Sequence, residues 1–241
     1  MMNEKTSITN LIRWYDSKIV CTGGVVFIGA GNTGKTHTAI NLTGYRGRGY
    51  YNESNATLKK SINLELDYFV FYSNIEEYKI TTSSQIFIMP GQKGRALDGE
   101  GLAFEDACDL YFKVATLNEI MVLILTYDLT NINTFQELEY WLDRAIERDF
   151  IQDYTSIILL GTHNDVKENI IITEDYIDTA ERFISYNVLK KKGLDIGNRI
   201  YSLKISNLTG EGISELKKII NLSFLSAFNI QEFIFGHDNR F

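Results

Sequence analysis

Proline and cysteine are scarce in this chain, and each scarcity excludes a class of protein. A single Pro among 241 residues excludes a proline-rich linker or a low-complexity segment. The two cysteines, Cys21 and Cys108, are too few and too far apart in sequence for a disulfide framework or a zinc site. They fit a reducing compartment, where such residues pack as small apolar groups. We therefore expect one globular domain with short extensions.

A net positive charge and long apolar runs are also missing. A net charge of -7 disfavours binding to nucleic acid, which requires a basic face. No apolar run reaches the length of a membrane span, and the N-terminus lacks the charged-then-apolar order of a signal peptide. Met at position 2 and Phe at the C-terminus match neither myristoylation nor prenylation. We expect a cytoplasmic protein, and peripheral membrane contact has no lipidation motif to support it.

Apolar strand-like runs alternate with helical patterns along the chain. This order predicts an α/β fold of three layers, with a mostly parallel six-stranded sheet covered by helices on both faces. The runs at 120–125 and 157–160 are continuous and suit the buried centre, whereas the run at 63–70 alternates and suits an edge. The expected strands are residues 24–29, 62–72, 79–89, 119–127, 156–161 and 200–205.

Two helices have clear sequence signals. Thr134 and Glu137 form a capping box that predicts a helix over 134–147. A last helix is expected over 213–222, with its apolar residues at helical spacing. The buried stripes expected on these two helices are Phe135, Leu138, Leu142 and Ile146, and then Ile213, Leu216 and Ile220.

We expect the domain to span residues 22–224, with an N-terminal extension at 1–21 and a tail at 225–241. The extension is predicted to be helical, because several apolar side chains share one helical face. It docks on the domain or lies on a membrane, and docking is favoured because its polar face is not rich in Lys or Arg. These apolar side chains are Ile8, Leu11, Ile12 and Tyr15.

The segment GAGNTGKT at 29–36 follows the apolar run at 25–28 and matches the phosphate-binding loop of nucleotide triphosphatases. Its glycines let backbone N–H groups point at a β-phosphate, and the helix that begins near Gly34 adds the positive end of its dipole. Lys35 would bridge the β- and γ-phosphates, and Thr36 would coordinate Mg²⁺. A plain glycine turn is the alternative. The other predicted phosphate-binding residues are Gly29, Gly31, Asn32, Thr33 and Gly34.

With four later segments in the expected order, residues 22–224 resemble a Ras-superfamily small GTPase. The segment IMPGQ at 88–92 stands in place of the family's D-x-x-G-Q. The resemblance implies that the Gly91 N–H reaches the γ-phosphate and that Gln92 orients the attacking water, with Gln92 and Lys35 catalytic. Ile88 stands where the family has a metal-binding Asp, as in the bacterial MglA branch. Without that carboxylate, Mg²⁺ would be held by Thr36, the β- and γ-phosphate oxygens, waters and Thr57, and the alternative is that another acidic group, such as Asp128 or Glu65, supplies the missing ligand.

The segment GTHND at 161–165 resembles the family's [NT]-K-x-D guanine motif, in a form close to that of Roc-type domains. Thr162 and Asp165 occupy the first and last motif positions. Asp165 would accept hydrogen bonds from guanine N1–H and the 2-amino group, which adenine cannot supply, and so would select GTP over ATP. His163 stands where a Lys lies across the base, and stacking and a plain loop role both remain open.

Two further stretches support the resemblance. The segment ISNLTGEG at 205–212 resembles the S-A-K-x-G-x-G loop, so Ser206 would brace Asp165 and the Asn207 backbone, beside Leu208, would meet guanine O6. Residues 127–142 resemble a Rab-like stretch whose residues are structural.

The first switch region is the least readable part of the sequence. Thr57 is the best candidate for the threonine that closes on Mg²⁺, and Ser61 competes with it. Arg46 or Arg48 would serve as an arginine finger in cis, although a solvated loop arginine is the commoner case.

The resemblance implies a Mg²⁺-dependent molecular switch that binds GTP and GDP and hydrolyses GTP slowly without an activating partner. Effector, exchange and activating proteins would bind through loops 43–60 and 91–106, and no nucleic acid is expected as a partner. One rival is a guanine-nucleotide-binding scaffold with little or no hydrolysis, motivated by Ile88 and His163. A second rival is a P-loop ATPase or kinase of another class, against which Asp165 argues.

Overall fold

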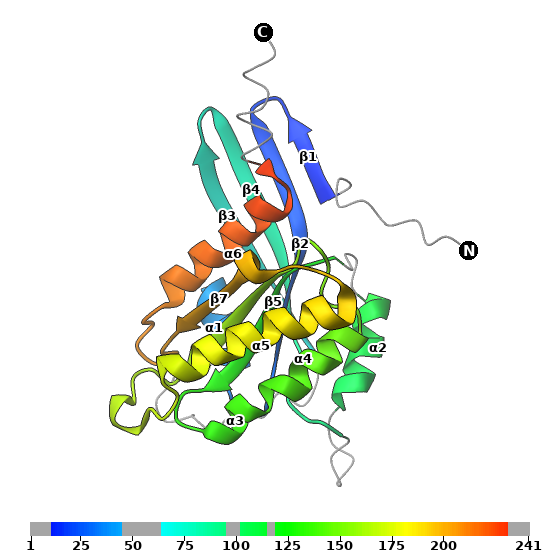
Figure 1. Cartoon of the computed structure of the whole chain (residues 1–241). Coiled ribbons are helices and arrows are strands. Elements are labelled where there is room, and N and C mark those ends of the chain that lie inside the picture. The colour runs from blue at the N-terminus through cyan, green and yellow to red at the C-terminus, as the bar shows by residue number, and fades with distance from the viewer. Residues whose placement is uncertain (1–10, 45–63, 95–101, 115–118, 231–241) are drawn as a thin grey trace, which may run out of the picture.

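The computed structural model describes residues 11–44, 64–94, 102–114 and 119–230. Seven strands form one sheet in the order β3-β4-β2-β5-β6-β7, and β1 pairs with β2 outside this path (Figure 1). The α/β fold class is confirmed. The strands are β1 (Ile12–Tyr15), β2 (Lys18–Gly29), β3 (Glu65–Ile75), β4 (Tyr78–Ile88), β5 (Ile120–Asp128), β6 (Ser156–Thr162) and β7 (Ile200–Lys204).

Helices cover both faces of the sheet. One buried apolar cluster joins α2, α4 and α5 to one face, and a second joins α1 and α6 to the other. The continuous apolar strands β5 and β6 lie between these layers, as the sequence predicts. The α-helices are α1 (Lys35–Thr43), α2 (Phe104–Val114), α3 (Ile132–Gln136), α4 (Leu138–Glu147), α5 (Glu174–Lys192) and α6 (Ile213–Ala227).

The central strands β4, β2, β5, β6 and β7 are parallel. Their carboxyl ends therefore meet at one edge of the sheet, which is where open α/β sheets bind ligands. The connections after these strands begin at residues 89, 30, 129, 163 and 205, respectively, and each of the predicted motifs lies at the start of one of them. The topology thus brings the motifs to one edge.

The predicted capping box at Thr134 is wrong. Asn131 caps α3, because its side-chain oxygen accepts a hydrogen bond from the Asn133 N–H at 3.1 Å. The Thr134 hydroxyl donates to the Asn131 carbonyl at 2.8 Å and accepts from the Asp128 N–H at 2.9 Å. The expected single helix over 134–147 also differs, because the chain forms two helices, α3 and α4, that meet at Glu137.

The predicted helix in the N-terminal extension is wrong for Ile12–Tyr15, which form strand β1 antiparallel to the start of β2. Ile12 and Trp14 pack on one side, on a small cluster that includes Ile19 and Leu225. Ile8 lies outside the described residues. The sheet therefore has one strand more than predicted.

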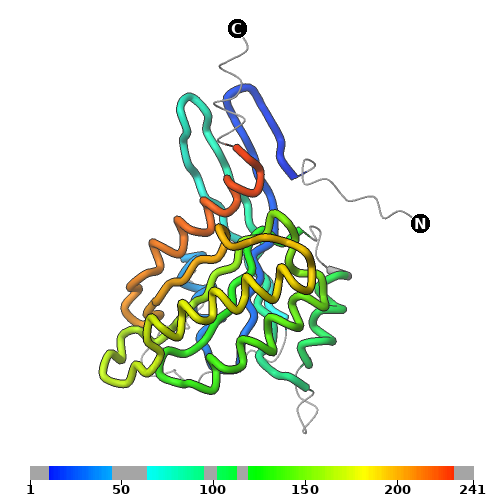
Figure 2. The backbone as a smooth tube through the Cα atoms, in the orientation of Figure 1, coloured from blue at the N-terminus to red at the C-terminus, as the bar shows by residue number. Residues whose placement is uncertain are grey.

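The last helix and the start of the tail also differ from the prediction. α6 continues to Ala227, past the expected end at 222, and Phe224, Leu225 and Ile230 are buried. The ends of the β1–β2 and β3–β4 hairpins project beyond the helical layers, with the C-terminal end of α6 beside them (Figure 2). The residues that follow 224 therefore belong to the packed domain as far as 230.

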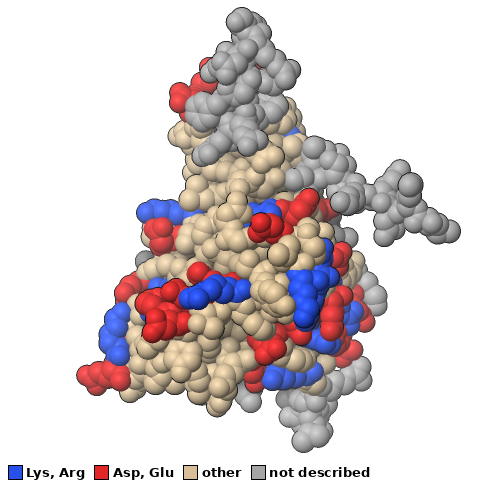
Figure 3. All heavy atoms as spheres, in the orientation of Figure 1, with Lys and Arg blue, Asp and Glu red and all other residues tan. Residues whose placement is uncertain are grey.

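Charges of both signs are interspersed over the helical layers in the view of Figure 3. No basic face is visible on that side, in keeping with the net charge of -7. Among the described residues, no helix has both the length and the apolar character to cross a membrane.

Candidate functional site

The loop between β2 and α1 has the backbone that a phosphate-binding loop requires. Asn32 and Gly34 adopt left-handed conformations, with φ of 63° and 80°, and Gly34 caps α1. A Cβ on Gly34 would lie 2.8 Å from the Asn207 side-chain nitrogen, so the position needs glycine for space as well as conformation. The Thr33 hydroxyl donates to the Ala30 carbonyl at 3.0 Å and closes the turn.

Lys35 lies inside this loop. Its side chain is buried, and its Nζ donates to the carbonyls of Gly29 at 2.8 Å and Ala30 at 2.6 Å. Burial lowers the pKa of Lys35 to about 7, and the Glu65 carboxylate opposes this shift. A phosphate at this site would restore the charge on the amine, since an anion favours the protonated form. Thr36 follows in the first turn of α1 and is half-buried.

Gly91 packs directly on the phosphate loop. A Cβ there would lie 2.4 Å from the Gly31 nitrogen and 2.7 Å from the Ala30 oxygen, so only glycine permits this approach. Gln92 follows, and its carbonyl accepts a hydrogen bond from the Phe104 N–H at 3.2 Å. Its side-chain oxygen is buried and has no hydrogen-bond partner among the described residues. An acceptor held without a partner beside this loop suits the predicted role of Gln92 on a water.

Ile88 and Glu65 lie opposite each other in the β3–β4 register. The Ile88 side chain is buried in the apolar cluster that includes Leu42 of α1, so it belongs to the core. Glu65 is half-buried, and its charge acts on Lys35. Strand β3 therefore brings the Glu65 carboxylate toward the phosphate loop, next to the position where Ile88 replaces the family's Asp.

Thr162 joins the guanine motif to the phosphate loop. It is fully buried, and its hydroxyl lies 3.0 Å from the Thr33 carbonyl and 3.1 Å from the Tyr127 carbonyl. Asp165 is half-exposed and makes no hydrogen bond or ion pair within the part of the chain that the structure describes. Its carboxylate is therefore available as an acceptor, and its contact with a guanine base stays a prediction.

The loop after β7 is joined to the guanine motif through the backbone. The Asn164 N–H donates to the Ile205 carbonyl at 3.0 Å, and the Asn164 side chain donates to Glu211 at 2.9 Å. The Ser206 hydroxyl accepts from the N–H groups of Leu208 at 3.2 Å and Thr209 at 3.0 Å. Ser206 thus braces its own loop, and its predicted contact with Asp165 is not among the hydrogen bonds of the described residues.

The Asn207 side chain contacts the phosphate loop, which the sequence did not indicate. Its Nδ2 donates to the Gly34 carbonyl at 3.2 Å, and its Oδ1 accepts from Thr38 at 3.1 Å and Asn41 at 3.2 Å. Thr38 and Asn41 lie three positions apart on one face of α1, but this spacing does not identify a partner elsewhere in the chain. The Leu208 side chain, in contrast, is exposed.

His163 and Asp128 form a pair beside the guanine motif. The His163 Nδ1 lies 3.3 Å from the Asp128 carboxylate and 3.0 Å from the Thr162 hydroxyl. The hydrogen bond to Asp128 raises the pKa of His163 against the opposing effect of burial. Burial raises the pKa of Asp128, but hydrogen bonds from His163 and Thr130 outweigh it and lower the pKa. This pair restrains the imidazole, whose predicted stacking on a base remains a prediction.

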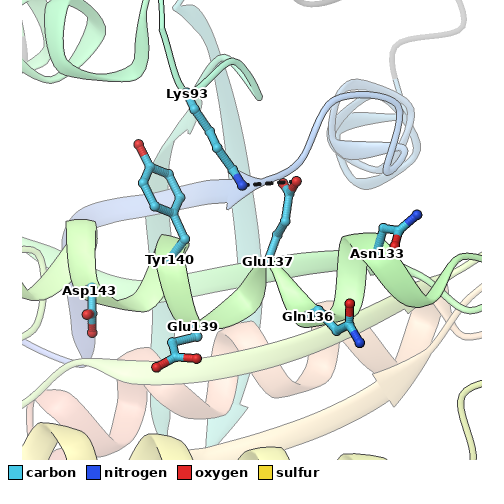
Figure 4. A pocket seen from close by; sticks show the side chains of 7 residues that line it. All are labelled: Lys93, Asn133, Gln136, Glu137, Glu139, Tyr140 and Asp143. Carbon is cyan, nitrogen blue, oxygen red and sulfur yellow. Dashed lines mark ion pairs between the residues drawn. The ribbon is translucent and has the colours of Figure 1, made fainter.

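An open groove of about 660 Å³ lies beside the site (Figure 4). Lys93, the residue after Gln92, reaches across it to the Glu137 carboxylate at 3.0 Å, and its Nζ lies 4.9 Å from the centre of the Tyr140 ring. No predicted nucleotide-binding residue lines the groove, so it is not the nucleotide site. Its lining residues are Lys93, Asn133, Gln136, Glu137, Glu139, Tyr140 and Asp143.

The residues present are compatible with Mg²⁺, which prefers oxygen ligands and keeps several waters. The Thr36 hydroxyl and the Glu65 carboxylate are oxygen donors on adjoining elements, whereas Ile88 supplies none. No cluster of three or more acidic, His or Cys side chains that could hold a metal by itself occurs in the described ranges. The nucleotide phosphates would therefore complete the site. The other candidates lie outside the described residues; they are Thr57, Ser61, Arg46 and Arg48.

Residues 110–214 match the model of the Ras family. The match covers less than half of the chain, from α2 to the start of α6, and includes both loops of the predicted base site. It does not include the phosphate loop at 29–36, which rests on its own motif and geometry. No curated protein matches the chain. The family match supports a GTP-binding G domain of the Ras type.

Proposed function

We propose that this protein is a molecular switch that binds GTP and GDP with Mg²⁺ and hydrolyses GTP. The observation that carries the proposal is the contact of the buried Thr162 hydroxyl with the Thr33 carbonyl at 3.0 Å. This contact joins a Ras-like base loop to a phosphate-binding loop at a fixed separation. A nucleotide with a guanine base and a polyphosphate chain fits such a pair of loops.

Nucleotide binding divides between these two loops. The backbone N–H groups of 29–36 and the Lys35 ammonium bind the phosphates, and Asp165 accepts the two guanine donors. Binding to adenine leaves the Asp165 carboxylate without those donors, which costs affinity. The side chains of Asn207 and Thr162 position the loops, and the backbone N–H of Asn207 donates to guanine O6.

Thr36 and the phosphate oxygens would hold the metal, with Glu65 as the acidic group that would replace the family's Asp. When bound, Mg²⁺ neutralises charge on the β- and γ-phosphates. Within the protein, Lys35 supplies positive charge at the same phosphates, and Gly91 brings its backbone against the loop that holds them. Thr57 remains the proposed threonine of the first switch.

Hydrolysis requires that a water be held in line with the γ-phosphate. Gln92 carries a side-chain oxygen with no partner among the described residues, so it can accept a hydrogen bond from that water. Because such catalysis is mostly positioning and charge neutralisation, we expect it to be slow until a partner completes the site.

Partner control would act through loops 43–60 and 91–106, whose central parts lie outside the described residues. The γ-phosphate would order them and hydrolysis would release them. A cytoplasmic location and a place near the MglA branch, with a Roc-like guanine motif, belong to the same proposal. The sequence features behind them are the two cysteines, which fit a reducing compartment, PGQ at 90–92 and GTHND at 161–165.

A single-turnover assay of γ-labelled GTP tests the proposal. The parent protein should convert bound GTP to GDP, and Gln92→Leu should keep GTP affinity while it loses most of the rate, because Gln92 acts on the water. Gln136→Leu is the matched control, since this exposed glutamine lines the neighbouring groove and should retain the parental rate. GTP binding without turnover in the parent would favour the scaffold alternative.

A further inference from the structure

Strand β3 forms one edge of the sheet and pairs only with β4 among the described strands. It is 11 residues long, or about 35 Å at a rise of roughly 3.3 Å per residue. An edge strand presents a row of backbone N–H and C=O groups that another strand can pair with. The edge of β3 is therefore long enough to accept a whole strand.

One side of β3 is apolar and exposed. Four alternate side chains on this side are between 40% and 81% exposed, and three of their four neighbours on β4 are polar and half-buried, the fourth being the buried Phe87. The other side carries Phe69 and Phe71, which pack edge to face and contact the cluster under α6. The four exposed residues, called here the β3 stripe, are Leu66, Tyr68, Val70 and Tyr72.

Beyond Asp67, β3 lacks the features that protect exposed edges. Natural edge strands carry lysine, proline or an inward charge, or are very short. The charges of β3 are Glu65 and Asp67, both at its N-terminal end, and the remaining eight residues, 68–75, are uncharged. An edge of this length and composition is a pairing surface.

We propose that β3 pairs antiparallel with β3 of a second copy of this chain, with Val70 opposite Val70 on the two-fold axis. The sequence of β3 is self-complementary in this register. Tyr68 of each copy lies opposite Tyr72 of the other, and Phe69 lies opposite Phe71, so aromatic residues pair on both sides of the sheet. The two β3 stripes then form one continuous surface.

Charge and hydrogen bonding agree with this register. Asp67 lies opposite Ser73 and Glu65 opposite Ile75, so no carboxylate directly faces another. A full pairing of two such strands makes about ten backbone hydrogen bonds, the number typical of a specific interface. A symmetric dimer also needs one patch that matches itself, and this strand supplies it. The interface does not depend on nucleotide hydrolysis.

Light scattering coupled to size-exclusion chromatography tests the dimer on the full chain at about 100 µM, a range that includes weak interfaces. The parent should run as a dimer. Val70→Lys should run as a monomer because it places two like charges on the axis, and Tyr72→Lys, at the most exposed position, should do the same with little effect on folding. Tyr186→Lys is the control, since Tyr186 is 60% exposed on α5, far along the fold from β3.

Oxidative cross-linking tests the register. Val70→Cys should form a disulfide between copies, because directly opposite Cα atoms lie about 4.5 to 5.5 Å apart, within disulfide range. Tyr68→Cys should not, because the two introduced thiols would be four positions apart along the strands. The parent protein, whose Cys21 and Cys108 are both buried, measures the background of cross-linking without an introduced cysteine.

A monomeric parent, a dimer that survives both lysine substitutions, or equal cross-linking by the two cysteine variants would each overturn the proposal. Circular dichroism melts confirm that the lysine variants are folded, so that a monomer reports the interface. A monomeric parent that binds an extended peptide along β3 would assign this edge to a different protein and would also count against the dimer.

Discussion

Replacement of Thr162 with Val should destabilise the protein and weaken nucleotide binding, because it removes the link between the base loop and the phosphate loop. Val keeps the shape of the side chain and removes the hydroxyl. That hydroxyl is fully buried and within hydrogen-bond distance of two carbonyls, those of Thr33 and Tyr127. The hydroxyl has a single hydrogen, so the carbonyl to which it donates would lose its donor in the interior.

The expected loss follows from the cost of a buried polar group without a partner. One hydrogen bond contributes about 1 kcal/mol, and a buried carbonyl left without its donor costs about 1 to 3 kcal/mol. We expect a decrease of about 2 kcal/mol in the free energy of unfolding, or a melting temperature lower by roughly 4 to 8 °C for a chain of this size. GDP affinity should fall as well, because the two loops are no longer held at one separation.

Thr126 offers a matched control on β5. It is also fully buried, but its hydroxyl has no hydrogen-bond partner among the described residues. Thr126→Val therefore removes an unpaired polar atom and should leave stability unchanged or raise it. Urea unfolding and GDP titration of both variants decide the matter. Equal destabilisation by the two substitutions would refute the role of the Thr162 hydroxyl.

Three further predictions concern charge at the site. Burial lowers the pKa of Lys35 to about 7, so above that pH the Lys35 amine of the free protein must take up a proton to bind phosphate. GDP affinity should therefore fall about tenfold per pH unit above about pH 7.5. Titration calorimetry in two buffers measures both the affinity and the proton uptake. Glu65→Gln should weaken Mg²⁺ binding in the GDP complex while Asp67→Asn, two residues along the same strand, should not, in a chelator titration; equal effects would remove Glu65 from the metal site. The hydrogen bond to Asp128 favours protonated His163 in the folded protein and raises its pKa. It therefore stabilises the fold below pH 6.5, and this stabilisation is lost as the pH rises through the raised pKa. Asp128→Asn removes the carboxylate and should return the pKa of His163, measured by NMR titration, toward 6.5.

The phosphate loop and the six predicted strands were readable from the sequence because their causes are local. A glycine-rich turn between a strand and a helix has a fixed residue pattern, and buried parallel strands are continuous apolar runs. The structure gives residues 29–36 the predicted strand, turn and helix, and it places the strands of the motif-bearing connections side by side.

Strand β1 could not be read in the same way. Ile12 and Tyr15 are three apart, as on a helix, whereas Ile12 and Trp14 are two apart, as on a strand, and four residues do not separate these periods. The pairing of β2 with the distant strand β5 decides that these residues form a strand. β2 begins at Lys18, but its pairing with β5 starts only at Gly24, so the first part of β2 has an edge along which β1 pairs.

The contacts that hold the site together were also beyond the sequence. Asn207 reaches Gly34 and Thr38 across more than 160 residues, and no local pattern indicates such a bond. The capping residue of α3 illustrates a different limit. Asn131 and Thr134 are both good caps and lie three residues apart, so the choice between them depends on the turn after β5.

Base selectivity tests the central claim most directly. GDP, ADP and XDP should be competed against a labelled guanine nucleotide on the parent, on Asp165→Asn and on Asp195→Asn, a control at a carboxylate outside the site. We predict that the parent and the control prefer GDP over ADP by orders of magnitude, and that Asp165→Asn loses GDP affinity and gains XDP affinity, because an amide donor suits the 2-oxo group. A parent that binds ADP as tightly as GDP, or an Asp165→Asn variant with unchanged guanine preference, would contradict the account.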